Sequence, residues 1–153
     1  MVQISVLFVC LGNICRSPMA EGAMRTIARD RGLDLEIDSA GTGGWHVGEA
    51  PDQRAQSTVA RHGGDISDLR ARQVTKDDFT QFTHIIALDH SNLTNLQRMA
   101  PPDATAELSL LLDHVEGREG QPVADPYYGA ADGFETTWTD VVTGTKALAD
   151  KLS

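Results

Sequence analysis

The stretch ISVLFVCLGNICRSP, residues 4–18, decides the fold of this chain. Its first half, Ile4–Val9, is an almost continuous apolar run with β-branched residues, which is typical of a strand buried on both faces of a parallel sheet. Its second half contains the pair Gly12-Asn13, which tolerates a positive φ and favours a tight loop. Ser17 is a favourable N-cap, and Pro18 is a favourable first helical residue. The stretch therefore predicts a strand, a loop and a helix start in direct succession.

Strand and helix patterns alternate through the rest of the chain. The first helix is expected to end near Gly32, since glycine commonly follows the last helical turn. Further strands are expected at 33–40, 84–88 and 107–112, and further helices at about 52–62, 91–99 and 134–152. This alternation predicts right-handed βαβ units. The expected fold class is therefore α/β: one domain, residues 1–153, with a small parallel sheet and helices on both faces.

Composition limits the class of protein. The chain has 153 residues, of which 41% are hydrophobic and 23% charged, as in one ordinary globular domain. The net charge of −9 argues against a nucleic-acid partner, although a single cleft can still be positive. The apolar start is too short to span a membrane and lacks the features of a signal peptide, so no membrane partner is expected. With Cys10 and Cys15 as its two cysteines, the chain is expected in the reducing cytoplasm.

The segment from Cys10 to Arg16 is the candidate reactive site. A loop between a strand end and a helix N-terminus points backbone N–H groups inward and forms an anion nest. The helix dipole favours the thiolate of Cys10, and Arg16 supplies a planar fork for two phosphate oxygens. Ser17 can donate a hydrogen bond to the sulfur. A lone cysteine at a strand end is more often a small core residue, but here the neighbours all agree with phosphoryl transfer. The lysine-bearing loop of nucleotide triphosphatases is absent from the sequence.

Phosphoryl transfer also requires an acid that protonates the leaving oxygen. Asp125 is the best candidate, because Pro126 restricts it to an extended conformation and the pair Tyr127-Tyr128 can wall a cleft. From spacing alone, a plain Asp-Pro turn with surface tyrosines is the simpler interpretation. Asp89 and Asp113 therefore remain rival acids.

The other polar and aromatic residues are interpreted without reference to catalysis. The histidines show no metal-ligand spacing and are expected to be structural or on the surface: His46, His62, His84, His90 and His114. Trp138 lies at helical spacing and is expected in the core. The acidic pairs Asp77-Asp78 and Asp89/Asp113 are expected to be solvated faces or helix caps.

The loop CLGNICRSP at 10–18, paired with DPYYG at 125–129, resembles the low-molecular-weight protein tyrosine phosphatase family in its bacterial form. Further matching segments are Ser39–Thr42, Trp45–Gly48, Pro51–Ala55, Ala71–Thr75, Asp89 and Ser91-Asn92. The resemblance implies a four-stranded parallel sheet, no metal, no cofactor, and hydrolysis of phosphotyrosine through a phosphocysteine. It implies Cys10 as nucleophile, Arg16 as phosphate clamp, and Asp125 as general acid and later base.

The resemblance also implies roles for the surrounding residues. Asn13 matches a loop asparagine held in a left-handed conformation, and Ser39 matches one of its supports. The candidate substrate-binding residues are Leu11, Gly12, Asn13, Ile14, Cys15, Ser17, Trp45, Tyr127 and Tyr128. Cys15 is either a redox guard of Cys10 or a core residue packed under the loop. Leu69 stands where many members have a histidine that braces the asparagine.

Two alternatives remain. A thiol-dependent arsenate reductase shares the loop and the fold, but it needs downstream cysteines, and the chain has none after Cys15. A non-catalytic phosphotyrosine-binding module would be favoured by loss of Cys10, Arg16 or Asp125, and all three are present. The expected partners are a phosphotyrosine-containing protein, for which the resemblance suggests a bacterial tyrosine kinase, and phosphate-like anions as inhibitors.

Overall fold

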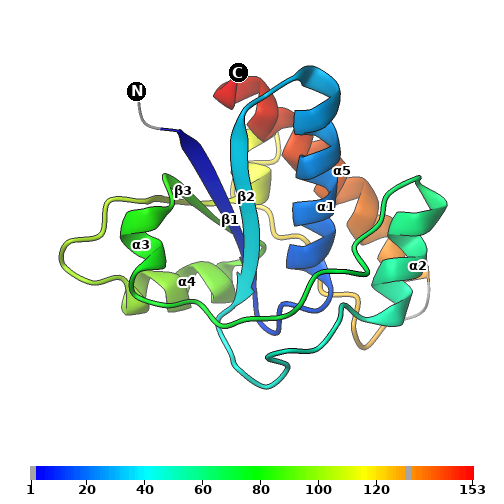
Figure 1. Cartoon of the computed structure of the whole chain (residues 1–153), viewed down its shortest axis with the longest axis horizontal. Helices are drawn as coiled ribbons and strands as arrows, with labels where there is room; N and C mark the ends of the chain where they lie inside the picture. The colour runs from blue at the N-terminus through cyan, green and yellow to red at the C-terminus, as the bar shows by residue number, and fades with distance from the viewer. Residues whose placement is uncertain (1–2, 130–131) are drawn as a thin grey trace.

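The structure is a computed structural model that describes residues 3–129 and 132–153. Its centre is a four-stranded parallel sheet in the order β2-β1-β3-β4 (Figure 1). The strands are β1 Ile4–Cys10, β2 Leu35–Gly41, β3 His84–Ala87 and β4 Glu107–Leu110. Because β1 pairs with β2 on one side and β3 on the other, its last residue lies in the middle of the carboxyl edge of the sheet. The α/β class and the parallel sheet are confirmed.

Helices cover both faces of this sheet, as predicted. Figure 1 shows α1 Arg16–Arg31, α2 Gln53–Arg61 and α5 Asp132–Leu152 on one side, and α3 Asp78–Gln81 and α4 His90–Met99 on the other. Side chains of β1 alternate between the two layers, since successive strand residues point to opposite faces. The first layer contains Val6, Phe8, Met24 and Val141, and the second contains Leu7, Val9, Phe79 and Leu96.

The start of α1 differs from the prediction. Cys15, and not Ser17, is the N-cap, and it makes no side-chain capping hydrogen bond. The hydroxyl of Ser17 lies instead 3.0 Å from the sulfur of Cys10 and is therefore unavailable as a cap. The first N–H groups of α1 consequently remain without a capping side chain, which leaves them free for an anion. The end of the helix is as expected, with Gly32 in the left-handed conformation at φ 66°.

The later part of the chain shows three smaller differences. The strand expected at 107–112 ends at Leu110, and a short 3₁₀ helix, η1 Leu111–His114, follows it. A Cβ at Gly144 would lie 2.5 Å from Cγ of Leu111, so this glycine lets α5 approach η1 closely. Trp138 is half-buried and stacks on the ring of His62, with a centroid distance of 5.4 Å.

Among the helices of the described residues, none combines the length and the apolar character that a membrane crossing requires.

The acidic pair Asp77-Asp78 is only partly as expected. Asp78 is buried, accepts from both terminal nitrogens of Arg72 and from the N–H of Thr75, and is not a solvated residue. Asp78 therefore connects the start of α3 to the segment that contains Arg72 and Thr75. The bridge between Gly41 and Gln73 lies in the same region and extends the β2 edge.

Candidate active site

The loop between β1 and α1 is fixed by the backbone of the neighbouring strand. The N–H of Thr42 donates to the carbonyl of Cys10, and the N–H of Gly43 donates to the carbonyl of Leu11, each at 2.9 Å. A Cβ at Gly41 would lie 2.7 Å from the carbonyl oxygen of Leu11, so only glycine permits this close approach. The loop thus curls at the carboxyl end of the central strand, which is where ligands bind in parallel sheets.

Asn13 is the central brace of the loop. With φ 58°, it is the only non-glycine residue at positive φ in the part of the chain that the structure describes. Its Oδ1 accepts from the N–H of Arg72 at 3.0 Å, and its Nδ2 donates to Ser17 at 2.8 Å and to Ser39 at 3.0 Å. These bonds offset the cost of a left-handed conformation, which asparagine tolerates better than most residues.

The hydroxyl of Ser17 lies between the brace and the sulfur. It accepts from Asn13, and its hydrogen has two acceptors within reach: Sγ of Cys10 at 3.0 Å and the carbonyl of Ala40 at 3.5 Å. Ser39 likewise accepts from Asn13 and donates to Oε1 of Glu21 at 2.7 Å. Burial raises the pKa of Glu21, and the hydrogen bonds from Ser39 and Arg25 oppose that rise. The network therefore begins at the buried carboxyl of Glu21 and ends at the hydroxyl of Ser17, 3.0 Å from the sulfur of Cys10.

Arg16 is buried at the floor of the site and is held by two acceptors. Its Nη1 donates to Oδ2 of Asp89 at 2.7 Å and to the carbonyl of Val123 at 2.9 Å. Its Nη2 lies 3.6 Å from Oδ2 of Asp125. Asp89 also caps α4 by accepting from the N–H of Asn92 at 2.8 Å. The guanidinium is therefore oriented before any substrate arrives.

The three candidate acids occupy different places. Asp125 lines the cleft, and its side chain is 43% exposed. Asp89 does not line the cleft and is occupied by Arg16 and the N-terminus of α4. Asp113 accepts from the N–H groups of Leu110 and Gly120 and serves as a turn and cap residue. Of the three, only Asp125 lines the cleft.

The cleft has a volume of about 140 Å³ and brings together most of the candidate residues. It is lined by Cys10, Leu11, Gly12, Ile14, Cys15, Arg16, Trp45, His46, Asp125, Tyr127 and Tyr128. Asn13, Ser17 and Ser39 are buried and do not line it. Asn13 and Ser17 were expected to bind substrate with the lining residues, whereas the structure places both behind the loop.

His46 is the site residue that sequence reasoning missed. It was expected to be structural or superficial, yet it lines the cleft, and its Cδ2 would lie 3.0 Å from a Cβ at Gly12. Its Nδ1 lies 3.2 Å from both carboxylate oxygens of Glu49. The available signal was its place directly after Trp45 in the loop that follows β2. Its spacing from the other histidines carries no signal for this position.

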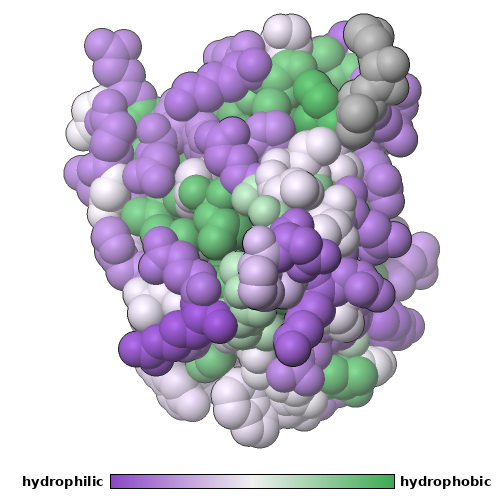
Figure 2. Space-filling view, turned by 90° about the vertical axis from the view of Figure 1, so that its left-hand side faces the viewer, coloured by the Kyte–Doolittle hydropathy of each residue, from purple (hydrophilic) through white to green (hydrophobic). Residues whose placement is uncertain are grey.

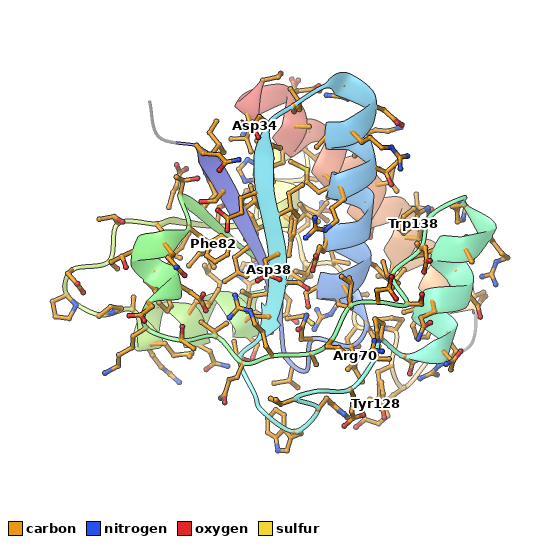
Figure 3. The ribbon with its side chains drawn as sticks, in the orientation of Figure 1. Asp34, Asp38, Arg70, Phe82, Tyr128 and Trp138 are labelled. Carbon is orange, nitrogen blue, oxygen red and sulfur yellow. The ribbon has the colours of Figure 1, made fainter. Side chains whose placement is uncertain are left out.

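The two tyrosines of the cleft are held to different degrees. Their rings make an edge contact with centroids 4.8 Å apart. The guanidinium of Arg54 lies over the ring of Tyr127 at 5.4 Å and is paired with Asp52 at 2.9 Å. Tyr128 is 94% exposed, and Figure 3 shows it at the end of the molecule where β1 and β2 finish. Tyr127 is therefore a fixed wall, and Tyr128 an outer one.

Comparison with known proteins identifies the group to which the chain belongs. The family described as low molecular weight phosphotyrosine protein phosphatase matches residues 5–153. The chain belongs to this family. The low molecular weight protein-tyrosine-phosphatase YfkJ of Bacillus subtilis is 44% identical over 148 residues, covering 95% of this chain and 94% of the relative. The human low molecular weight phosphotyrosine protein phosphatase is 41% identical over 150 residues, covering 96% and 94%.

Solved structures agree with the phosphatase family. The crystal structure of YfkJ from Bacillus subtilis has a TM-score of 0.92 at 42% identity and covers 99% of this chain and 96% of that chain. The crystal structure of DARP, a Drosophila arginine phosphatase, has a TM-score of 0.91 at 33% identity, with 97% of each chain covered. The predicted family and the four-stranded sheet that it implied are therefore confirmed.

Cys15 and Leu69 of this phosphatase pack beneath the loop. Cys15 is buried, and its burial, together with the negative charge of Asp52, raises its pKa far above the ordinary value. Leu69 is half-buried against the apolar cluster that contains Ile14 and Cys15. It fills its site by packing, so the brace of Asn13 consists of Ser17, Ser39 and the backbone of Arg72.

Among the described residues, no group of three or more His, Cys, Asp or Glu side chains could hold a metal ion.

Proposed function

We propose that this phosphatase hydrolyses phosphotyrosine in proteins through a cysteinyl-phosphate intermediate on Cys10. The observation that carries the proposal is the convergence of Cys10, Arg16 and Asp125 on one cleft. A thiol at the carboxyl end of β1 faces an uncapped helix N-terminus, a buried guanidinium closes the opposite side, and an exposed carboxyl stands at the mouth. Family membership supports the same class of reaction.

The first step transfers the phosphoryl group to sulfur. Backbone N–H groups of the loop and the fork of Arg16 hold the non-bridging oxygens, and the thiolate of Cys10 attacks phosphorus. The bond between phosphorus and the tyrosyl oxygen breaks. Asp125, in its protonated form, gives its proton to that oxygen, so tyrosine leaves as the neutral phenol.

The second step releases phosphate. The carboxylate of Asp125 removes a proton from a water molecule, and the water oxygen attacks phosphorus. The bond between sulfur and phosphorus breaks, and its electron pair returns to Cys10 as thiolate. The hydroxyl of Ser17, 3.0 Å from Sγ, stabilises the departing thiolate by donating a hydrogen bond. Asp89 acts through Arg16, whose position it fixes.

The walls of the cleft favour an aryl phosphate. Leu11, Trp45 and Tyr127 present apolar and aromatic surface above the anion nest. A phenyl ring between such walls buries apolar area and stacks favourably while its phosphate reaches the loop. The shorter phosphoserine side chain would leave those walls in water.

The finer assignments extend this proposal. The family domain spans residues 1–153, and its substrates are phosphotyrosine-containing proteins of the cytoplasm. A bacterial tyrosine kinase is a candidate substrate. Phosphate-like anions inhibit by competing for the nest of N–H groups and Arg16.

The test is hydrolysis of para-nitrophenyl phosphate and of a phosphotyrosine peptide by the parent and by Cys10→Ser. The parent should turn over both, whereas the variant should bind phosphate but show less than a few per cent of parent turnover, because a serine hydroxyl stays un-ionised at neutral pH. A phosphoarginine peptide belongs in the same assay, since one structural neighbour is named an arginine phosphatase. Preference for that peptide would overturn the substrate assignment.

A further inference from the structure

A second groove adjoins the active-site cleft. It has a volume of about 290 Å³, and its lining includes Leu11, Thr42, Trp45, Asn95, Arg98 and Met99. Leu11 and Trp45 line both cavities, so they form a ridge between the cleft and the groove. These two side chains are 45% and 71% exposed. A peptide whose phosphotyrosine occupies the cleft can therefore cross the ridge and place a neighbouring side chain in the groove.

The far wall of the groove is rigidly connected to the catalytic loop. Asn95, Arg98 and Met99 are spaced three and four residues apart on α4, so they share one face of that helix. Asp89 caps α4 and holds Arg16 at 2.7 Å. The side of the molecule that carries α3 and α4 has small apolar patches among hydrophilic side chains (Figure 2). The groove thus has a fixed position relative to the cleft.

Arg98 gives the groove its charge. It is exposed, and it is the only charged side chain lining the groove among the described residues. Its guanidinium takes part in no ion pair or side-chain hydrogen bond with residues 3–129 and 132–153. Arg61 and Arg118, by contrast, pair with carboxylates at 2.7 and 2.9 Å. On the groove side of the ridge, the guanidinium of Arg98 is therefore available to a ligand.

We propose that this groove is a substrate subsite that takes an acidic side chain flanking the phosphotyrosine. The inference rests on the proposed function, since the phosphotyrosine anchors the peptide. A Glu or Asp carboxylate can accept two hydrogen bonds from the fork of Arg98, while its stem contacts Met99 and Trp45. Asp125, Tyr127 and Tyr128 line only the cleft and not the groove. An acidic residue directed to that side approaches the carboxyl of Asp125, which repels it when charged. An acidic residue is therefore favoured on the flank that faces the groove and disfavoured on the other.

The experiment compares phosphotyrosine peptides that carry either Glu or the isosteric Gln on one flank, and then on the other. The measured quantity is the ratio of kcat/KM for Glu over Gln within each protein. For the parent, the ratio should be about two to five on one flank, the range expected for an exposed ion pair. It should fall to about one in Arg98→Gln and below one in Arg98→Glu. Arg29→Gln, an exposed position on the last turn of α1, is the matched control and should keep the parent ratio.

Two further measurements separate the possible failures. In the parent, the ratio should approach one at about 0.5 M salt, where exposed ion pairs are screened; this arm needs no variant. Para-nitrophenyl phosphate has no flanking residues and tests the active site in the same samples. A parent inactive on it contradicts the proposed function. An active parent with the same Glu/Gln ratio as Arg98→Gln contradicts the acidic subsite.

Discussion

The two sides of the active site are built in opposite ways. On the nucleophile side, Cys10, Asn13 and Ser17 are buried and joined by short hydrogen bonds. The buried guanidinium of Arg16 is held separately, by Asp89 at 2.7 Å. On the acid side, Asp125 is 43% exposed and accepts one backbone hydrogen bond, from Tyr127 at 3.1 Å. Groups that stabilise the developing charge must be preorganised, because any reorganisation would add to the barrier. The side that admits the tyrosine and the water must stay open.

The largest expected effect is on the open side. Asp125→Asn should slow hydrolysis of phenyl phosphates by roughly 10² to 10⁴, the usual contribution of a general acid. The loss should shrink as the leaving phenol becomes more acidic, because such a phenolate needs no proton. The measurement is kcat across a series of substituted phenyl phosphates. An equal loss for every leaving group would indicate a structural role, and Asp89→Asn would then be compared.

Breaking the buried side at Asn13 is expected to have the next largest effect. Asn13→Ala removes bonds to Ser17 and Ser39 and leaves a β-carbon at φ 58° without its compensating contacts. We expect kcat to fall by roughly 10 to 10², and stability by about 1–3 kcal/mol, the cost of a strained conformation.

The variant Asn13→Gly separates the two causes of that loss. Glycine accepts the same φ but offers no side chain, so Asn13→Gly should recover stability and not kcat. Recovery of both quantities would mean that the hydrogen bonds do not orient Ser17. Urea unfolding and steady-state kinetics provide the two measurements.

The ion pair of Asp52 and Arg54 connects the two sides, and its effect should be smaller. The N–H of Asp52 donates to the carbonyl of Ile14 in the loop, and Arg54 stacks on Tyr127. The hydrogen bond from Arg54 lowers the pKa of Asp52. Because the folded-state pKa is depressed, the stabilisation is present above the unfolded pKa and is lost as the pH falls through the folded one.

The corresponding variants are Asp52→Asn and Asp52→Ala. Asp52→Asn keeps an N-cap oxygen for α2 and should lose only the part of the stability that depends on pH. Asp52→Ala should lose about 1 kcal/mol more, the usual value of a cap. Thermal unfolding from neutral to acidic pH is the measurement. Parallel profiles for the parent and Asp52→Asn would exclude the pair as a source of pH dependence.

The smallest expected effect sharpens the comparison within the open side. Tyr128 is 94% exposed, so Tyr128→Ala should change kcat/KM for para-nitrophenyl phosphate by about two-fold or less. Tyr127 is held by Arg54. Tyr127→Ala should raise KM more than it changes kcat, because the ring contacts the substrate equally in the ground state and in the transition state. Equal effects of Tyr127→Ala and Tyr128→Ala would show that the exposure of a tyrosine does not determine its contribution to substrate binding.

Local patterns in the sequence were sufficient for the sheet, the main helices and the reactive loop. The apolar run at 4–9 has no polar face, as expected for a strand that is buried on both faces of a sheet, and it forms β1. Gly32 ends α1 as predicted. The four-residue helix α3 and the 3₁₀ turn after Leu110 are too short to give a period. The place of Gly144 in α5 has no local explanation, because its reason is a contact with Leu111 from a distant segment.

Site residues that depend on long-range contacts were the harder part. Ser17 has the ordinary signal of an N-cap, and only the position of the Cys10 sulfur reveals its other use. Asp89 carried the signal of a cap and of a rival acid, but nothing local indicates that it binds Arg16 across 73 positions. His46 enters the cleft because the loop after β2 folds against Gly12. Each of these contacts joins segments whose proximity arises from the tertiary fold.

The burial of Cys15 has a consequence for chemical labelling. The thiolate is the nucleophilic form of cysteine, and a buried thiol with a raised pKa supplies little of it. Cys10, the other cysteine of the chain, is buried to a similar extent, and both residues line the cleft. Cys10 differs in lying at the carboxyl end of β1, before the uncapped N-terminus of α1, where an anion is stabilised. A small anionic alkylating reagent such as iodoacetate should therefore modify Cys10 and spare Cys15. Such a reagent would report, by the mass of the intact chain, the fraction of active sites open to an anion.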